Sequence, residues 1–145
     1  DVSGFVTACC EEFLPADDRG ITLTTDIQPE VQATFNPSLL QRAVYNLLQN
    51  AYKYGKPGGH ITVTLREAGH GAALSVADDG IGIAPEDQEK IWQRFWQADP
   101  SRGEDGGSGL GLSMVQEIAA FHGGRATVDS APGQGSTFTI TLPRR

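Results

Sequence analysis

Polar side chains recur at helical spacing in the segment NLLQNAYKYG, residues 46–55. Asn46 and Asn50 stand one helical turn apart, and Lys53 and Tyr54 follow on the next turn. Asparagine is a poor helix former because its side chain competes for backbone hydrogen bonds. An asparagine carbonyl can ligate Mg²⁺, a lysine can neutralise phosphate, and a tyrosine ring can cover an aromatic base. Together these residues suit a charged ligand, although on their own they fit a solvated helix edge better.

A carboxylate and two glycines end the apolar segment VADDGIGIAP at residues 76–85. Asp78 can accept a hydrogen bond from an exocyclic amine such as that of adenine. Gly80 and Gly82 permit positive φ and let the backbone approach a flat base closely, and Ile83 belongs to the same segment. Taken alone, an Asp-Gly turn after a strand is common, so this motif gains weight only from its neighbours.

Glycines are concentrated in GGSGLGLS, residues 106–113, which leads into a helical pattern. Free amides at a helix N-terminus beside a flexible glycine loop bind anions well. No Lys-Ser/Thr pair follows and no strand precedes, so the segment is neither a Walker loop nor a dinucleotide fingerprint. A mobile surface loop with a helix N-cap is the alternative interpretation.

Aromatic and basic residues occur together just before this loop, in IWQRFWQADPSRG at residues 91–103. The aromatic residues are Trp92, Phe95 and Trp96. They could pack a movable loop against a binding site, or simply dock a helix on the core, and Arg94 or Arg102 could reach phosphate.

Hydrophobic patterns place these motifs on strands and helices. We expect helices over 2–14, 37–55, 85–97 and 110–124, and strands over 21–27, 60–67, 72–78, 125–130 and 136–142. In the second helix, at about 100° per residue, six apolar residues share one broad arc with Asn46, Asn50 and Lys53 along its edge. The arc consists of Leu40, Ala43, Val44, Leu47, Leu48 and Ala51. Because strands and helices interleave, with hairpins among the strands, the sequence predicts an α+β fold, a two-layer sandwich.

Composition limits the fold and the partners. The 145 residues are 39% hydrophobic and 20% charged, enough for one compact domain over 1–145. A net charge of −7 argues against binding to nucleic acid or anionic membranes, and no apolar run approaches the length of a membrane span. Cys9 and Cys10 form neither a disulfide framework nor a metal spacing, which favours a reducing, cytoplasmic location. The chain starts at Asp1 without an initiator Met, so we expect a piece of a longer protein.

Four stretches in this order resemble the catalytic, ATP-binding domain of bacterial sensor histidine kinases. NLLQNAYKYG looks like the family's N box, DDGIGI its first glycine box, IWQRFWQAD its F box and GGSGLGLSMV its second glycine box. The terminal GQGSTFTITLP is also typical of the family's last strand. The resemblance spans nearly the whole chain. It implies the Bergerat fold, in which helices cover one face of a mixed, mostly antiparallel sheet and ATP lies between them under a flexible lid.

The resemblance implies a role for each polar residue of these motifs. Asn50 would hold Mg²⁺, with Asn46 beside the metal and the phosphates. Lys53 would touch phosphate, Tyr54 would lie against the adenine, and Asp78 would accept from the adenine amino group. The other residues expected at the nucleotide are Gly80, Gly82, Ile83, Arg94, Phe95, Arg102, Gly107, Gly109, Leu110 and Gly111. The cofactors expected are therefore ATP and Mg²⁺, with Asn46, Asn50 and Lys53 as the catalytic group.

The residue at one position of the N box bears on the mechanism. Gyrases, heat-shock chaperone ATPases and mismatch-repair ATPases share this fold and hydrolyse ATP with a Glu one helical turn before the metal-binding Asn. Here that position is Asn46, whose amide cannot take a proton at neutral pH. A site with Mg²⁺, Lys and amides suits transfer to an incoming imidazole, which is its own nucleophile. We therefore predict a protein-histidine kinase with negligible ATPase activity of its own.

The phosphoacceptor histidine is expected outside this chain. Family members phosphorylate a His in a separate helical hairpin that also dimerises, whereas His60, His70 and His122 are predicted to be structural or solvent-exposed. The partners implied are the upstream hairpin of the parent kinase and, indirectly, a response regulator, and the fragment alone would be monomeric. Two alternatives stay open: an anti-sigma-type protein-serine kinase, and a regulatory module that binds ATP without catalysis.

Overall fold

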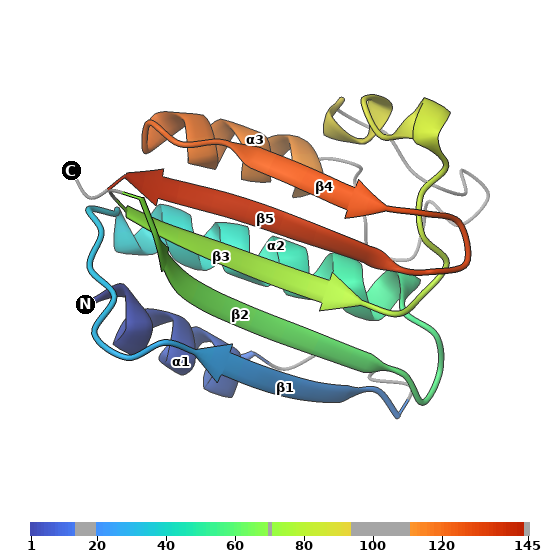
Figure 1. Ribbon diagram of the computed structural model, residues 1–145, viewed down its shortest axis with the longest axis horizontal. Helices are drawn as coiled ribbons and strands as arrows, with labels where there is room; N and C mark the ends of the chain where they lie inside the picture. Colours follow the sequence, from blue (N-terminus) through green and yellow to red (C-terminus); the bar gives the residue numbers. More distant parts are fainter. Residues whose placement is uncertain (14–19, 70, 94–110, 144–145) are drawn as a thin grey trace.

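The computed structural model describes residues 1–13, 20–69, 71–93 and 111–143 (Figure 1). Its helices are α1 (Val2–Glu12), α2 (Pro37–Tyr54) and α3 (Gly111–Phe121), with two short 3₁₀ turns, η1 (Pro85–Asp87) and η2 (Lys90–Trp92). Its strands are β1 (Thr22–Ile27), β2 (His60–Ala68), β3 (Gly71–Asp78), β4 (Ala126–Ser130) and β5 (Ser136–Pro143).

The five strands form one mixed sheet in the order β1-β2-β3-β5-β4. β1 pairs with β2 in parallel, and the other pairings are antiparallel. Figure 1 shows the helices gathered on one face of this sheet. Alternate strand residues face the helices and are buried, which is the pattern of a sheet with one covered face. The predicted α+β two-layer sandwich is therefore confirmed.

The long helix α2 is favoured by capping residues at its N-terminus and by an apolar face that packs on the core. Asn36 is the N-cap and accepts a hydrogen bond from the Leu39 N–H at 3.1 Å. Pro37 stands in the first turn, where its missing N–H leaves no partner unsatisfied. All six residues of the predicted apolar arc are buried, whereas Asn46 and Asn50 are half-buried at its margin. The polar edge predicted from the sequence thus lies where the helix leaves the core.

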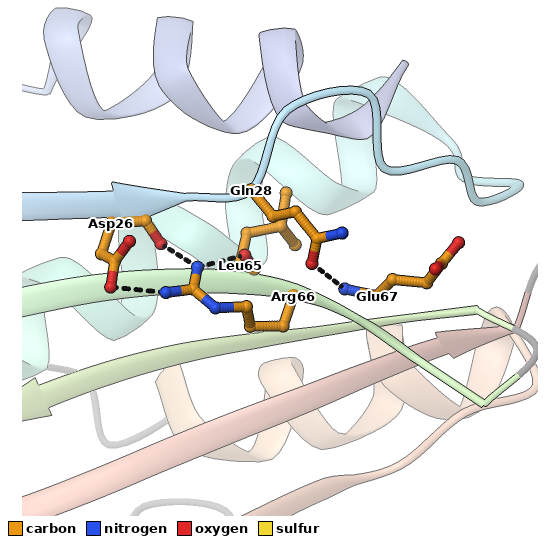
Figure 2. Close-up of polar contacts among 5 residues, drawn as sticks. All are labelled: Asp26, Gln28, Leu65, Arg66 and Glu67. Atoms are coloured by element: carbon orange, nitrogen blue, oxygen red, sulfur yellow. Dashed lines mark hydrogen bonds and ion pairs between the residues drawn. The ribbon is translucent and has the colours of Figure 1, made fainter.

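Polar contacts at the end of β1 connect this edge strand to β2 (Figure 2) and also to α1. Arg66 donates to the backbone carbonyl of Asp26 at 2.9 Å and forms an ion pair with the Asp26 carboxylate. The Gln28 side chain accepts from the Glu67 N–H at 2.9 Å, and the Gln28 carbonyl accepts from the Ser3 hydroxyl at 2.6 Å. Backbone groups where β1 stops pairing are satisfied in this way, and the start of α1 is held against the sheet.

The predicted helix over 85–97 is wrong in its described part, which contains the separate turns η1 and η2. Ile91 is buried, and Trp92 beside it packs edge-on against Phe138 with ring centroids 5.9 Å apart. Two adjacent apolar residues cannot form the i, i+4 stripe that holds a helix on a core, so short turns suffice. None of the helices in the described ranges is long and apolar enough to cross a membrane.

Candidate functional site

A cleft of about 310 Å³, partly open to solvent, lies at the C-terminal end of α2. It is lined by Asn50, Tyr54, Asp78, Ile81, Gly82, Ile83, Leu112 and Ser136. The structure therefore brings together residues from α2, the end of β3, the loop after it, the start of α3 and the start of β5.

The polar edge of α2 borders this cleft. Asn50 lines it, and Asn46 lies one helical turn earlier. The Asn46 side-chain nitrogen is buried and has no hydrogen-bond partner among the described residues. A Cβ placed on Gly111 would lie 3.9 Å from Asn46 Cγ, so the first turn of α3 packs beside this amide. Lys53 Nζ lies 5.3 Å from the centroid of the Tyr54 ring, within the range of a cation–π contact.

Two adjacent aspartates at the end of β3 have opposite environments. The Asp78 carboxylate accepts from the Gly80 N–H at 2.9 Å, and burial raises the pKa of Asp78 above its ordinary value, with the nearby Asp79 charge adding to the rise. Asp79 accepts from the His60 N–H with both oxygens, at 3.0 and 3.1 Å. Although desolvation alone would raise it, the pKa of Asp79 is lowered by this His60 amide and by the Lys56 charge. Asp78 thus faces the cleft at an energetic cost, whereas Asp79 stabilises the start of β2.

The glycines after β3 are required mainly by contacts with other backbone. A Cβ on Gly80 would lie 2.0 Å from the Tyr54 carbonyl oxygen, and Ile81 donates to that same oxygen at 3.2 Å. Gly82 has φ +73°, and a Cβ there would lie 1.9 Å from the Ala131 carbonyl oxygen. Gly82 uses the positive φ that glycine permits, whereas Gly80 does not. In the structure, both glycines bring backbone segments together and so shape the cleft wall.

Several predicted nucleotide-binding residues lie outside the described residues: Arg94, Phe95, Arg102, Gly107, Gly109 and Leu110. Ile81, Leu112 and Ser136 line the cleft but were not predicted from the sequence. Ile81 and Leu112 could have been inferred, because they stand inside the two glycine-rich motifs. Ser136 could not, because it comes into place only through its pairing opposite Asp78 between β5 and β3.

The described histidines are structural or exposed, as predicted. The His122 ring accepts from the Asn36 N–H through Nε2 at 2.9 Å, and its Nδ1 is 2.7 Å from the Ile118 carbonyl. Both ring nitrogens are therefore engaged between α2 and α3. The His60 side chain is 69% exposed and has Nδ1 3.6 Å from Asp79. His70 lies outside the described residues.

The structure combines a mixed sheet that has helices on one face with a cleft to which α2 contributes an amide and a tyrosine. A half-buried aspartate at a strand end lines the same cleft. These features define a class of α/β-sandwich domains that includes both ATPases and kinases. The chain belongs to the histidine kinase-, DNA gyrase B- and HSP90-like ATPase family, whose model matches residues 35–145.

Curated relatives of the chain are sensor kinases. The sensor-like histidine kinase SenX3 of Mycobacterium tuberculosis is 43% identical over 145 residues, which cover 99% of this chain and 35% of SenX3. The sensor histidine kinase RppB of Synechocystis is 43% identical over 145 residues, covering 98% of this chain and 32% of RppB. The chain thus spans about a third of the length of these relatives.

Solved structures agree with this relationship. The mycobacterial sensor histidine kinase MprB matches with a TM-score of 0.83 at 32% identity, over 99% of this chain and 94% of that chain. Full-length ShkA in complex with AMPPNP matches with a TM-score of 0.84 at 29% identity, over 99% of this chain and 30% of that chain. The resemblance to sensor histidine kinases is therefore confirmed.

Proposed function

We propose that this domain binds Mg²⁺-ATP in the cleft and transfers the γ-phosphoryl group to a histidine on the upstream dimerisation hairpin of the same sensor kinase, in two-component signal transduction. The observation that carries the proposal is the meeting of Asn50, Tyr54 and Asp78 in one cleft of a chain of this family. The three residues supply a metal ligand, a ring and a hydrogen-bond acceptor, which are complementary to the parts of a magnesium-bound nucleotide.

The edge of α2 suits the phosphates and the metal. Amide oxygens such as that of Asn50 are hard ligands of the kind that Mg²⁺ takes together with phosphate oxygens and water. The unpaired amide of Asn46 needs an acceptor, which a phosphate oxygen or a metal-bound water would supply. When bound, Mg²⁺ would neutralise charge on the β- and γ-phosphates. Lys53 would add a positive charge beside them after leaving the Tyr54 ring.

The other end of the cleft suits adenine. The Asp78 carboxylate accepts from the backbone N–H groups of Gly80 and Ser136, and its two oxygens have lone pairs left for the exocyclic amine of the base. Tyr54 would cover one face of the base, with Ile81 and Ile83 forming an apolar wall. The half-buried Asp78 carboxylate gives this end of the cleft its preference for a donor.

Transfer rather than hydrolysis follows from the residue types. In the reaction the bond between the γ-phosphorus and its bridging oxygen breaks, a bond to an imidazole nitrogen forms, and ADP leaves. An imidazole attacks with its own lone pair, so no protein base is needed. Asn46 stands where a water-activating Glu would be required, and its amide cannot take a proton. We therefore expect negligible ATP hydrolysis.

Because ATP and response regulators occur in the cytoplasm, we place the domain there, as a monomer when separated from its hairpin.

Calorimetric titration of the domain with ATP tests the proposal. The wild-type domain should bind ATP only with Mg²⁺ present, and Asn50→Ala should weaken that binding by roughly tenfold or more, as expected for a lost metal ligand. Gln49→Ala is the matched control, because Gln49 is the preceding, exposed residue of α2 and does not line the cleft. Equal affinity of the Asn50→Ala and wild-type domains would refute the assignment.

Transfer is measured on a longer chain that includes the hairpin. Radiolabelled ATP should give an acid-labile phosphohistidine. A stable phosphoserine on a small partner protein would instead support the serine-kinase alternative, and ATP binding without any transfer would support the regulatory module.

A further inference from the structure

Ser130, at the end of β4, lies behind the wall of the cleft and connects three segments. Its hydroxyl oxygen accepts from the Ile83 N–H at 2.8 Å and lies 2.8 Å from the Gly135 carbonyl oxygen. It also lies 2.8 Å from the hydroxyl oxygen of Ser136, which lines the cleft. Ser130 and Ser136 are register partners of β4 and β5, so their hydroxyl contact is a cross-strand pair at the end of the sheet.

The direction of each hydrogen bond follows from counting protons. A serine hydroxyl has one hydrogen and two lone pairs. The Gly135 carbonyl can only accept, so the hydrogen of Ser130 points to it. The Ile83 N–H occupies one lone pair of the Ser130 oxygen. The remaining contact requires Ser136 to donate to Ser130, which leaves the Ser136 oxygen as an acceptor in the cleft.

The same serine helps to hold the wall in place. The Gln88 side chain donates to the Ile83 carbonyl at 3.0 Å and to the Ser130 carbonyl at 2.9 Å. Ile83 is therefore held through both its N–H and its carbonyl, by side chains from β4 and from the segment after η1. Gly133 adds a backbone hydrogen bond to Ile81 at 2.8 Å.

We propose that Ser130 is a positioning residue that determines base specificity, an inference that rests on the ATP-binding function proposed above. Ser130 accepts the hydrogen bond of the Ser136 hydroxyl, so the Ser136 oxygen is left to act as an acceptor. The cleft is then lined by two acceptor residues, Asp78 and Ser136, which are partners in the β3–β5 pairing. Two acceptors favour a base with an amino group at position 6. They disfavour a base with a carbonyl at position 6, such as hypoxanthine. A carbonyl oxygen is itself an acceptor, so it cannot form a hydrogen bond with either of them.

The test compares ATP with ITP by calorimetry in the presence of Mg²⁺. Wild type should prefer ATP. In Ser130→Ala the Ser136 hydroxyl can turn and donate into the cleft, so the ratio of the ITP and ATP dissociation constants should fall about three- to tenfold, the effect of one hydrogen bond. The ratio separates this effect from general loosening of the wall, which weakens both nucleotides. Ser130→Thr keeps the hydroxyl and should restore the ratio.

Ser75→Ala is the matched control. It breaks a different cross-strand hydroxyl pair, that of Ser75 in β3 and Thr139 in β5, whose oxygens are 3.0 Å apart. Neither residue lines the cleft, so the ratio should stay unchanged. An unchanged ratio in a folded Ser130→Ala domain would overturn the inference. If Ser130→Ala does not fold, Ser136→Ala decides, since it removes only the acceptor and should selectively weaken ATP. Equal loss for both nucleotides would then count against specificity. Failure of wild type to bind ATP would refute the proposed function itself.

Discussion

Replacing Asp78 by asparagine should separate nucleotide affinity from stability. Besides the backbone N–H of Ser136, the carboxylate serves the Gly80 N–H at 2.9 Å and, in the proposed complex, the amine of the base. Asparagine has one oxygen, so its amide nitrogen must face one of these donors. A hydrogen bond to a charged group contributes about 1.5–3 kcal/mol, which corresponds to roughly a 10- to 150-fold loss of ATP affinity. Calorimetry with Mg²⁺-ATP measures this loss.

The stability of the nucleotide-free domain should not fall in the same way. Burial raises the pKa of Asp78, so the stability linked to this group is fully present below its unfolded pKa and is lost as pH rises through its folded pKa. Asp78→Asn removes this poorly solvated carboxyl group, whose charged form is disfavoured by burial. Urea denaturation at pH 7 should show the variant to be at least as stable as wild type, and its relative advantage should shrink in acid.

Asp79→Asn is the matched control on the neighbouring residue. The pKa of Asp79 is lowered, so its contribution to stability is present above its unfolded pKa and lost as pH falls through the folded value. This variant should lose stability at pH 7, because the His60 N–H loses a charged acceptor, while ATP affinity changes little. The reasoning would be refuted if Asp78→Asn retained wild-type affinity, or if it were the less stable of the two variants at pH 7.

Two further predictions concern the wall of the cleft and the thiols. Gly82→Ala should lower the free energy of unfolding by more than about 2 kcal/mol, because strain at φ +73° adds to a clash with the Ala131 backbone. Gly133→Ala is the control: Gly133 has φ +77° but open space around it, so the loss should be only about 1–2 kcal/mol. Similar losses for the two variants in urea denaturation would contradict the clash. Burial raises the pKa of Cys9 and Cys10 to about 11, so about one thiol in a thousand is ionised at pH 8. Both should react with a disulfide reagent only as fast as the domain unfolds, and immediate labelling of the native domain would show that the thiols are accessible.

The parts of this site that could be predicted from the sequence are those formed by residues of a single helix or strand. The edge of α2 was predictable, because residues on one helix share a face whenever their spacing matches its period, and Asn46, Asn50 and Lys53 have that spacing. The acceptor at Asp78 was predictable as the end of a strand followed by glycines. The fold class followed from the same periods, since the apolar residues of the strands and helices fit one covered sheet face.

The contacts made by Ser130 and Ser136 were not predictable. The register of β4 with β5 pairs the two serines with each other, whereas the contact of Ser130 with Ile83 and the pairing of Ser136 with Asp78 juxtapose residues far apart in the chain. The contact that requires a glycine at position 80 was not predictable for a similar reason. Its missing side chain is required by the Tyr54 carbonyl, a contact that exists only after α2 has packed beside the end of β3.

Two described polar groups at the cleft are held in unfavourable states, and their chemistry is complementary to a nucleotide. The Asp78 carboxylate is desolvated, and its oxygens have lone pairs beyond those used by the N–H groups of Gly80 and Ser136, so it can take a further donor. The Asn46 side-chain nitrogen is buried and unpaired, so it needs an acceptor. A ligand that satisfies both must carry an amine at one end and an oxygen-rich, anionic group at the other, as ATP does. Because unpaired buried polar groups are rare in folded domains, the Asn46 amide next to the cleft, together with the desolvated Asp78 carboxylate that lines it, favours a ligand site over a solvated helix edge.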